Sequence, residues 1–391
     1  MPQGDSTKVS VLFVAAMGGL GGPVKRLATL LANLQDVHRV LIKPYSELLD
    51  KRIYEWGSVD EHIQMRRSAR RSKVGSFLLA MKVFVRAASR KQPIDVIHAN
   101  GIVEFALSWP AALLLGKPIV TWVGNYEWPA MVKRFNWVFR SVSSRTRWNA
   151  VSATAADVIA DCGLAPRSVV RVVTNIVDPA DVAPTRNVFM NPDPSRLRIG
   201  YLQVSRWMKG FDMLPKVIAE LSDVHNRVQF LIYGTIGRGP VWDELATIPP
   251  GVVEMRPKTA NVGDIYAECD IIFSPSRRES FNRVVAEALT TGTPVVASDL
   301  EPVREVVGEA ALLFPVDDVS AAAAALRRLV DSPDLRALLS RTGKLRSKAW
   351  LPGPVAEEFE SQYRSVAKLR PHRRDVGGPS GRTSADQKPS G

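Results

Sequence analysis

Two glutamates, Glu279 and Glu287, lie eight positions apart in a segment whose pattern predicts a strand, a loop and then a helix. Glu279 falls in the loop and Glu287 inside the helix, for which Ser280 is the predicted N-cap. The start of a helix offers unpaired N–H groups and the positive end of a dipole, so it is suited to bind a diphosphate. Glu287 flanks the apolar face of the helix, where a carboxylate needs bonded partners. Sugar hydroxyls would serve, and a salt bridge on an ordinary surface helix explains the pattern equally well.

A second charged group is the loop Ser205–Gly210, which contains Arg206 and Lys209 and follows a predicted strand. The Arg206 guanidinium is a planar fork of donors and the Lys209 ammonium is a point charge, and both bind diphosphate oxygens well. The alternative is that both are exposed surface cations, because Lys and Arg side chains are mostly exposed.

The remaining candidates are weaker. Gly21 and Gly22 end a glycine-rich strand-to-helix turn, where the backbone can approach a ligand closely. The turn lacks the dinucleotide fingerprint, and no acidic residue ends the next predicted strand, which argues against NAD binding. His98 ends a predicted strand, so we expect it either to contact substrate or to be a buried, hydrogen-bonded histidine. The histidines and the two cysteines, Cys162 and Cys269, have no metal-binding spacing, so no metal site is predicted.

These residues are positioned by strands that alternate with helices, which is the pattern of parallel sheets flanked by helices. In the first half the predicted strands are 9–15, 37–42, 94–98 and 118–123, and the predicted helices are 23–34 and 77–88. A proline-rich break at 178–194 predicts a linker. In the second half the predicted strands are 198–204, 228–233, 252–255, 271–274 and 294–297, and the predicted helices are 211–221, 281–290 and 321–330. The fold class is therefore α/β, with two doubly wound Rossmann-like domains, 1–182 and 183–350, facing a ligand cleft.

The chain of 391 residues carries a net charge of +13, which favours polyanionic partners. Residues 64–92 contain basic but no acidic side chains. The cluster most suited to an anionic membrane surface is Arg66, Arg67, Arg70, Arg71 and Lys73. Nucleic acid is not an expected partner, because the stretch shows no aromatic interleaving and no recognised module.

The expected cellular location follows from the cysteine count and from the length of the apolar runs. Two cysteines are too few for a disulfide framework, and no apolar run of about eighteen residues occurs. We therefore expect a cytoplasmic protein without a transmembrane helix, peripheral on the inner face of the plasma membrane. The tail 370–391 is basic and rich in Gly, Pro and Ser, so it is predicted to be disordered.

The segment that starts at Asp270 reads DIIFSPSRRESFNRVVAEALTTGTPVVASDLEPVREVVGEAALLFPVDD. It resembles the retaining glycosyltransferases of the GT-B fold called family 4, in its paired glutamates, in the strand that follows them and in a later glutamate, here Glu305. Weaker matches are GGLGGPVKRLATLLANL near the start, DVIHANG, AVSATAADVI, TNIVDP and KGFDML. The final segment WLPGPVAEEFESQYRSVAK is similar to the family's last helices, which implies that 351–369 crosses back to the first domain.

The resemblance implies transfer of a sugar from a nucleoside diphosphate sugar to an acceptor hydroxyl, with retention of anomeric configuration and without a metal or other cofactor. Glu287 would bond the ribose, Glu279 would lie near the donor sugar, and Arg206 and Lys209 would neutralise the diphosphate. The other implied donor-binding positions are Gly21, Gly22, Ser280, Phe281, Asn282, Arg283 and Val284. A phosphate oxygen would take the acceptor proton, so catalysis would be mainly electrostatic and positional. A carbohydrate or lipid-linked acceptor, as in polysaccharide biosynthesis, is expected, with the first domain on the acceptor side and the second domain binding the nucleotide sugar.

Three positions depart from the family pattern. Asn125 stands where many members have a histidine, so it would replace a contact with the donor sugar. Arg206 lies closer to Lys209 than is typical, and Asn282 replaces a usual glycine. The alternatives are another enzyme of similar fold, such as a nucleotide-sugar epimerase or an NADP-linked oxidoreductase, or a non-catalytic nucleotide-sugar-binding protein.

Overall fold

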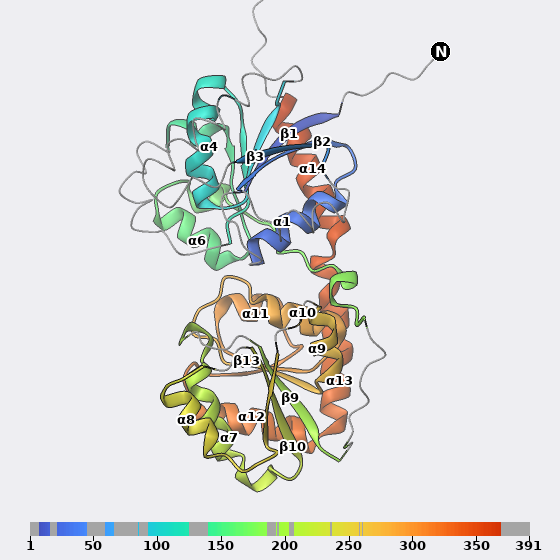
Figure 1. Cartoon of the computed structure of the whole chain (residues 1–391). Coiled ribbons are helices and arrows are strands. Elements are labelled where there is room, and N and C mark those ends of the chain that lie inside the picture. Colours follow the sequence, from blue (N-terminus) through green and yellow to red (C-terminus); the bar gives the residue numbers. More distant parts are fainter. Residues whose placement is uncertain are drawn as a thin grey trace, which may run out of the picture.

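The computed structural model describes residues 8–15, 22–44, 59–65, 85, 93–124, 140–185, 193, 195–202, 207–234, 237–257, 259 and 261–368. In these residues the chain forms two separate six-stranded parallel sheets, each flanked by helices (Figure 1). The predicted α/β class with two doubly wound units is therefore confirmed.

The first sheet has the strand order β3-β2-β1-β4-β5-β6, and all of its pairs are parallel. Its strands are β1 (Val9–Val14), β2 (Val37–Pro44), β3 (Glu61–Met65), β4 (Val96–Ala99), β5 (Ile119–Thr121) and β6 (Thr146–Arg147). Its helices are α1 (Gly22–Asn33), α4 (Ile102–Leu115) and α6 (Ala153–Asp161), and a small parallel pair is formed by β7 (Asn149–Ala150) and β8 (Arg171–Val172). The central strand β1 is buried along most of its length, because helices cover a parallel sheet on both faces.

The second sheet has the strand order β11-β10-β9-β12-β13-β14, again with parallel pairs. Its strands are β9 (Leu197–Leu202), β10 (Val228–Tyr233), β11 (Val253–Arg256), β12 (Ile271–Ser274), β13 (Val295–Ser298) and β14 (Leu312–Phe314). Its helices are α7 (Leu214–Glu220), α8 (Pro240–Ala246), α9 (Val262–Glu268), α10 (Arg283–Thr291), α11 (Glu301–Val307), α12 (Val319–Asp331) and α13 (Pro333–Arg346). The strand order reverses between β9 and β12, and such switch points open a crevice at the carboxyl ends of the strands.

The chain passes between the two halves twice. The first passage includes a 3₁₀ turn, Pro179–Val182, which packs against α9 and α10. The second passage leads to α14 (Pro352–Lys368), which packs against α1, β1 and β4 of the first half. Figure 1 shows it in red beside α1 and β1. The buried amides of Asn149 and Gln362 exchange hydrogen bonds of 2.9 and 3.1 Å and hold α14 on the first half.

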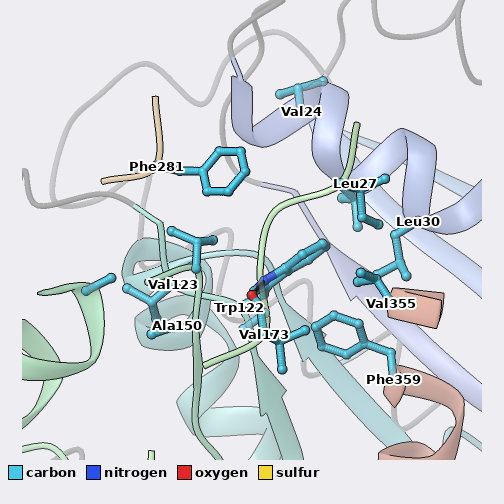
Figure 2. Packing of buried hydrophobic residues seen from close by; sticks show 14 of the residues in the cluster. Val24, Leu27, Leu30, Trp122, Val123, Ala150, Val173, Phe281, Val355 and Phe359 are labelled. Carbon is cyan, nitrogen blue, oxygen red and sulfur yellow. Dashed lines mark hydrogen bonds between the residues drawn. The ribbon is translucent and has the colours of Figure 1, made fainter. Parts of the chain in front are cut away.

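Apolar side chains from both halves form one continuous core cluster. Phe281 of the second half lies in this cluster together with Trp122 of the first half and Phe359 of α14 (Figure 2). The rings of Trp122 and Phe359 are 4.7 Å apart, and Phe281 meets Trp350 edge to face at 6.2 Å. Because burial of apolar surface drives association, this shared cluster holds the two halves against each other.

Among the helices that the structure describes, none is both long and apolar enough to cross a membrane. Apart from Val85, the predicted helix 77–88 lies outside the described residues, as do the basic cluster at 66–73 and the tail 370–391.

Candidate functional site

The helix that carries Glu287 begins at Arg283, and its N-cap is Asn282. The prediction that Ser280 caps this helix was wrong, because the chain reverses later, at Asn282, which has a left-handed backbone (φ 60°). The Asn282 side chain accepts from the Val285 N–H at 3.3 Å and donates to the Ser274 hydroxyl at 3.0 Å. Ser280 instead donates its hydroxyl to the carbonyl of Gly124 at 2.5 Å, so it connects the glutamate loop to the first half.

The two charged loops identified in the sequence meet in the structure. The Lys209 ammonium lies 2.6 Å from Oε1 of Glu279, and the Ser276 hydroxyl donates to the same oxygen at 2.8 Å. This contact depends on Gly210, which has φ 67° and whose added Cβ would lie 1.9 Å from the carbonyl oxygen of Pro275. Only glycine therefore lets the loop after β9 pack so closely on the loop after β12.

Glu287 is only 4% exposed, and its carboxylate is bonded on both oxygens. Oε1 lies 2.6 Å from Nε of Arg283 and 3.5 Å from the ammonium of Lys25, and Oε2 accepts from the Tyr266 hydroxyl at 2.8 Å. Burial alone would raise the pKa of Glu287, but the charges of Arg283 and Lys25 outweigh it and hold the pKa below its ordinary value. The partners that a buried carboxylate needs are thus supplied by the protein.

Asp181 of the linker turn extends this group of charges. Its Oδ2 lies 3.7 Å from the Lys25 ammonium and 3.8 Å from Nη2 of Arg283. Arg283 also donates to the carbonyl of Ile176 at 2.8 Å. The Lys25–Glu287 cluster, consisting of Lys25, Asp181, Arg283 and Glu287, therefore balances two cations with two carboxylates and joins α1, the linker and α10.

Arg26 of α1 is 2% exposed and joins α1 to the residues that follow β4 and β5 in the first half. Its guanidinium donates to the side chain and carbonyl of Asn100 and to the carbonyl of Trp122, at 2.7 to 2.9 Å, and stacks 4.5 Å above the Trp122 ring. Burial lowers the pKa of Arg26 to about 9. Gly124 lies against it, since a Cβ there would be 2.5 Å from Nη1 of Arg26. The sequence analysis did not identify Arg26, although its spacing of four from buried Leu30 places it on the packed face of α1.

His98 is fully buried, and its Nδ1 shares a hydrogen bond of 2.8 Å with the Tyr363 hydroxyl. Burial, with the nearby Arg26 charge, lowers the pKa of His98 to about 3, so the ring is neutral at pH 7. Its packing against Phe13 and Phe359 favours the expectation of a buried histidine, and the alternative of a substrate contact stays a prediction.

The other predicted site residues divide into described and undescribed positions. Gly22 opens α1, Phe281 lies in the shared core, and the Val284 carbonyl accepts from the Tyr266 hydroxyl at 3.4 Å. Positions outside the described residues are Gly21, Asn125, Arg206 and the membrane cluster Arg66, Arg67, Arg70, Arg71 and Lys73.

A further contact between the halves involves Glu305 of α11, to which the sequence analysis gave no role. Both carboxylate oxygens of Glu305 accept from the N–H of Ala153, at 2.8 and 3.1 Å, at the first residue of α6. Beside this contact lies a cavity of about 300 Å³ whose lining includes Ser152 and Thr174 of the first half and Phe281 of the second.

The arrangement as a whole is suited to hold an anion and hydroxyl groups between two sheets. The N–H groups of Arg283 and Val284 precede the capped N–H of Val285 and the first intrahelical bond of α10, which starts at Ala286, and Lys209 lies on the adjacent loop as a fixed cation. Glu279 and Glu287 add carboxylates that accept hydrogen bonds. In the part of the chain that the structure describes, no three His, Cys, Asp or Glu side chains are grouped to hold a metal ion.

Two facing parallel-sheet units with such a site between them define a glycosyltransferase of the GT-B fold. Residues 17–181 match the family described as Glycosyltransferase Family 4, and residues 194–332 match the family described as Glycosyl transferases group 1. Together the two matches span most of the chain, which is therefore a glycosyltransferase with one region of each family.

Several known proteins are similar to this chain. The 2-deoxystreptamine glucosyltransferase of Streptomyces kanamyceticus is 25% identical over 74% of this chain and 79% of its own length. The MMP alpha-(1->4)-mannosyltransferase of Mycolicibacterium hassiacum is 26% identical over 66% of this chain and 67% of its own. The phosphatidyl-myo-inositol mannosyltransferase of Mycobacterium leprae is 32% identical over 41% of this chain and 44% of its own.

Solved structures share the fold at lower identity. The crystal structure of Anabaena HepE in complex with UDP and glucose has a TM-score of 0.73 at 15% identity, covering 91% of this chain and 99% of that one. A glycosyltransferase from Rickettsia africae has a TM-score of 0.74 at 16% identity, covering 93% of this chain and all of that one.

Proposed function

We propose that the enzyme moves a sugar from a nucleoside diphosphate sugar to an acceptor hydroxyl with retention of anomeric configuration and without a metal ion. The observation that carries this proposal is the contact of 2.6 Å between Lys209 and Glu279 next to the start of α10. It fixes a cation beside a helix N-terminus, where a diphosphate binds. The hydrogen bond from Ser280 to Gly124 brings the first half to the same place.

The proposed reaction needs little covalent chemistry from the protein. The bond from the sugar C1 to the diphosphate oxygen breaks, and Lys209 and the first N–H groups of α10 stabilise the negative charge that develops on the leaving group. The acceptor oxygen bonds to C1 from the face that the diphosphate leaves, and its proton passes to a phosphate oxygen. Glu279 acts as a positioning residue in this step, since it holds the Lys209 ammonium in place.

We further propose that Glu287 bonds a ribose hydroxyl of the donor. Of its three protein partners, Lys25 is the most distant, at 3.5 Å, and Lys25 keeps Asp181 at 3.7 Å as a second partner. A ribose hydroxyl can therefore take the place of Lys25 while Arg283 and Tyr266 continue to hold the carboxylate.

A carbohydrate or lipid-linked acceptor remains part of the proposal, with the enzyme on the cytoplasmic face of an anionic membrane. The cluster of basic residues from Arg66 to Lys73 supports the membrane location, because positive side chains are attracted to anionic lipids. The matching M. leprae protein, named for a phosphatidylinositol acceptor, supports a lipid-linked substrate. Salt-sensitive binding to vesicles containing anionic lipid is expected. Equal binding to neutral vesicles, or no binding to either, would remove this part.

The decisive test is a thermal-shift panel of the full chain with UDP, GDP, ADP and their sugars, followed by assay of sugar transfer and nucleotide release. One base should raise the melting temperature in both its free and sugar-linked forms. Lys209→Met should lower kcat about 100- to 1,000-fold with that donor, while exposed Lys216→Met on α7 should not. Tight binding of a nucleotide sugar without transfer or hydrolysis would overturn the proposed reaction.

The ribose assignment is tested separately by Glu287→Ala. Loss of the acceptor for a ribose hydroxyl should weaken donor binding by about 1–3 kcal/mol in calorimetry. Unchanged donor affinity in a variant that remains folded would refute the assignment.

A further inference from the structure

A hollow of about 320 Å³ on the second half lies outside the contacts of Glu279 and Glu287. It is formed by the loop after β9 and the start of α8, and its lining residues are Trp207, Phe211, Asp212, Arg238, Gly239, Pro240, Val241 and Trp242. Its volume is in the range of small-molecule sites. Three aromatic rings line it, and the rings of Phe211 and Trp242 are 5.0 Å apart.

Trp207 is unusual among these rings because it is 67% exposed. Its neighbour Met208 is 37% exposed, so the loop presents two large apolar side chains next to the hollow. A single exposed apolar residue needs no explanation, but an exposed pair beside an aromatic hollow is a feature of binding surfaces.

The exposed ring is also held in place. The guanidinium of Arg277 lies 4.8 Å from the Trp207 ring centre and donates to the Trp207 carbonyl at 2.8 Å. Arg277 itself donates to both carboxylate oxygens of Asp212, at 2.6 and 2.8 Å, and to the carboxylate of Asp317 at 2.7 Å. One face of the indole is therefore occupied by a fixed cation, and its exposure leaves the other side accessible to a ligand.

The edge of the hollow carries two side chains that can form hydrogen bonds, Asp212 and Arg238. The Asp212 side chain is 37% exposed, and its carboxylate oxygens can accept more hydrogen bonds than the two they receive from Arg277. The Arg238 side chain is exposed and offers a fork of donors. A pyranose ring matches this combination, because its C–H face packs on the electron-rich face of an indole and its hydroxyls bond at the edge.

The position of the hollow connects it to the reaction. Trp207 and Lys209 belong to the same 3₁₀ turn, and Lys209 bonds Glu279. A saccharide that extends from the reacting hydroxyl along this loop would therefore place a later sugar unit in the hollow. Binding energy gained there from a unit that does not react would favour longer acceptors.

We propose that this hollow, with Trp207 as its platform and Asp212 and Arg238 at its edge, binds a pyranose unit of a saccharide acceptor away from the transferred sugar. The role of this hollow as an acceptor site rests on the proposed function. Binding of a sugar in the hollow can be measured without any sugar transfer.

The experiment is binding of methyl glycosides of glucose, galactose, mannose and N-acetylglucosamine to the full chain, measured by ligand-observed NMR and tryptophan fluorescence. At least one glycoside should bind, and Trp207→Ala should weaken it at least tenfold. Trp207→Phe should retain part of the binding because it keeps an aromatic face. Leu345→Ala on α13, at a side chain that is 65% exposed, is the matched control and should bind as the wild type does.

The same variants are tested for thermal shift with the donor. An unchanged donor shift in Trp207→Ala together with lost glycoside binding supports a separate sugar site. The proposal is overturned if no glycoside binds, if Trp207→Ala binds equally well, or if UMP or AMP displaces the glycoside and the hollow is a base site. Absence of any donor shift with retained glycoside binding would instead contradict the proposed function alone.

Discussion

The Lys25 ammonium lies 3.5 Å from Oε1 of Glu287, although the two residues are 262 positions apart and belong to different halves of the molecule. Both side chains are largely buried, at 15% and 6% exposure. Opposite charges at this depth are screened less than surface pairs, so this contact favours the closed arrangement of the halves. Closure in turn excludes water from a glycosyl-transfer site.

Lys25→Met should favour separation of the two halves. Loss of the contacts with Glu287 and Asp181 is expected to cost about 1 kcal/mol, or about a fivefold change in the ratio of the closed population to the open population. Energy transfer between dyes placed on the two halves measures this population. Lys216→Met, which also removes one positive charge, is the control and should keep the closed population of the wild type. Equal closed populations in Lys25→Met and the wild type would show that the pair does not contribute to closure.

Glu305→Ala should release the start of α6 from α11. The Ala153 N–H would lose both of its carboxylate acceptors, which lie at 2.8 and 3.1 Å, together with a favourable charge at a helix N-terminus. Hydrogen exchange of a peptide that covers the first turn of α6 should become several-fold faster, with a loss of stability of about 1 kcal/mol. Glu301→Ala, at an exposed position on α11, is the control. Unchanged exchange in Glu305→Ala would mean that α6 is held by other contacts.

Asn282→Ala should destabilise the enzyme more than Asn282→Gly. Alanine loses the N-cap bond to Val285 and is strained at φ 60°, which together cost about 2 kcal/mol. Glycine loses the same bonds but adopts this backbone freely, so its cost should be about 1 kcal/mol. Urea denaturation gives both values. An equal loss for the two variants would show that the side-chain bonds, and not the backbone conformation, require asparagine here.

The main strands were predictable from sequence because each is a short and mostly apolar run, as in β10 (Val228–Tyr233) and β12 (Ile271–Ser274). The sequence analysis did not identify α4, since its apolar residues surround the helix without a single stripe and Pro110 lies inside it. It also did not identify α9 and α11, which have only seven residues each and too few turns for a clear period. Length alone does not separate the predicted helices from the missed ones, since α7 also has seven residues and was predicted, whereas α13 has fourteen and was not.

The site was predictable only in part, for a related reason. The meeting of Lys209 with Glu279 follows from topology, because both loops leave the carboxyl ends of neighbouring strands, β9 and β12. The contacts of Glu287 with Lys25 and of Glu305 with Ala153 depend on how two separately folded halves pack. No local pattern encodes such a distance. Burial of Arg26 and His98 likewise arises from the packing of α1 and α14 on the first sheet.

His98 should make the stability of the enzyme depend on pH. Its folded pKa of about 3 lies well below the ordinary value of 6.5. Between these values the unfolded chain binds a proton that the folded chain does not, so stability rises with pH in this window. The contribution of the neutral His98 ring to the free energy of unfolding is therefore fully present above pH 6.5 and is lost as the pH falls toward 3. Between pH 6.5 and 5 the loss of unfolding free energy amounts to about 2 kcal/mol.

His98→Asn removes the titrating ring and should flatten this part of the pH profile. Urea denaturation of both proteins at a series of pH values from 7 to 5 measures the free energy of unfolding of each. The variant is expected to be less stable at pH 7, because its smaller side chain leaves space beside Phe13 and Phe359. The informative quantity is the difference between the two profiles, which should shrink by about 2 kcal/mol toward pH 5. Parallel profiles would show that the ring is protonated in the folded enzyme as readily as in the unfolded chain.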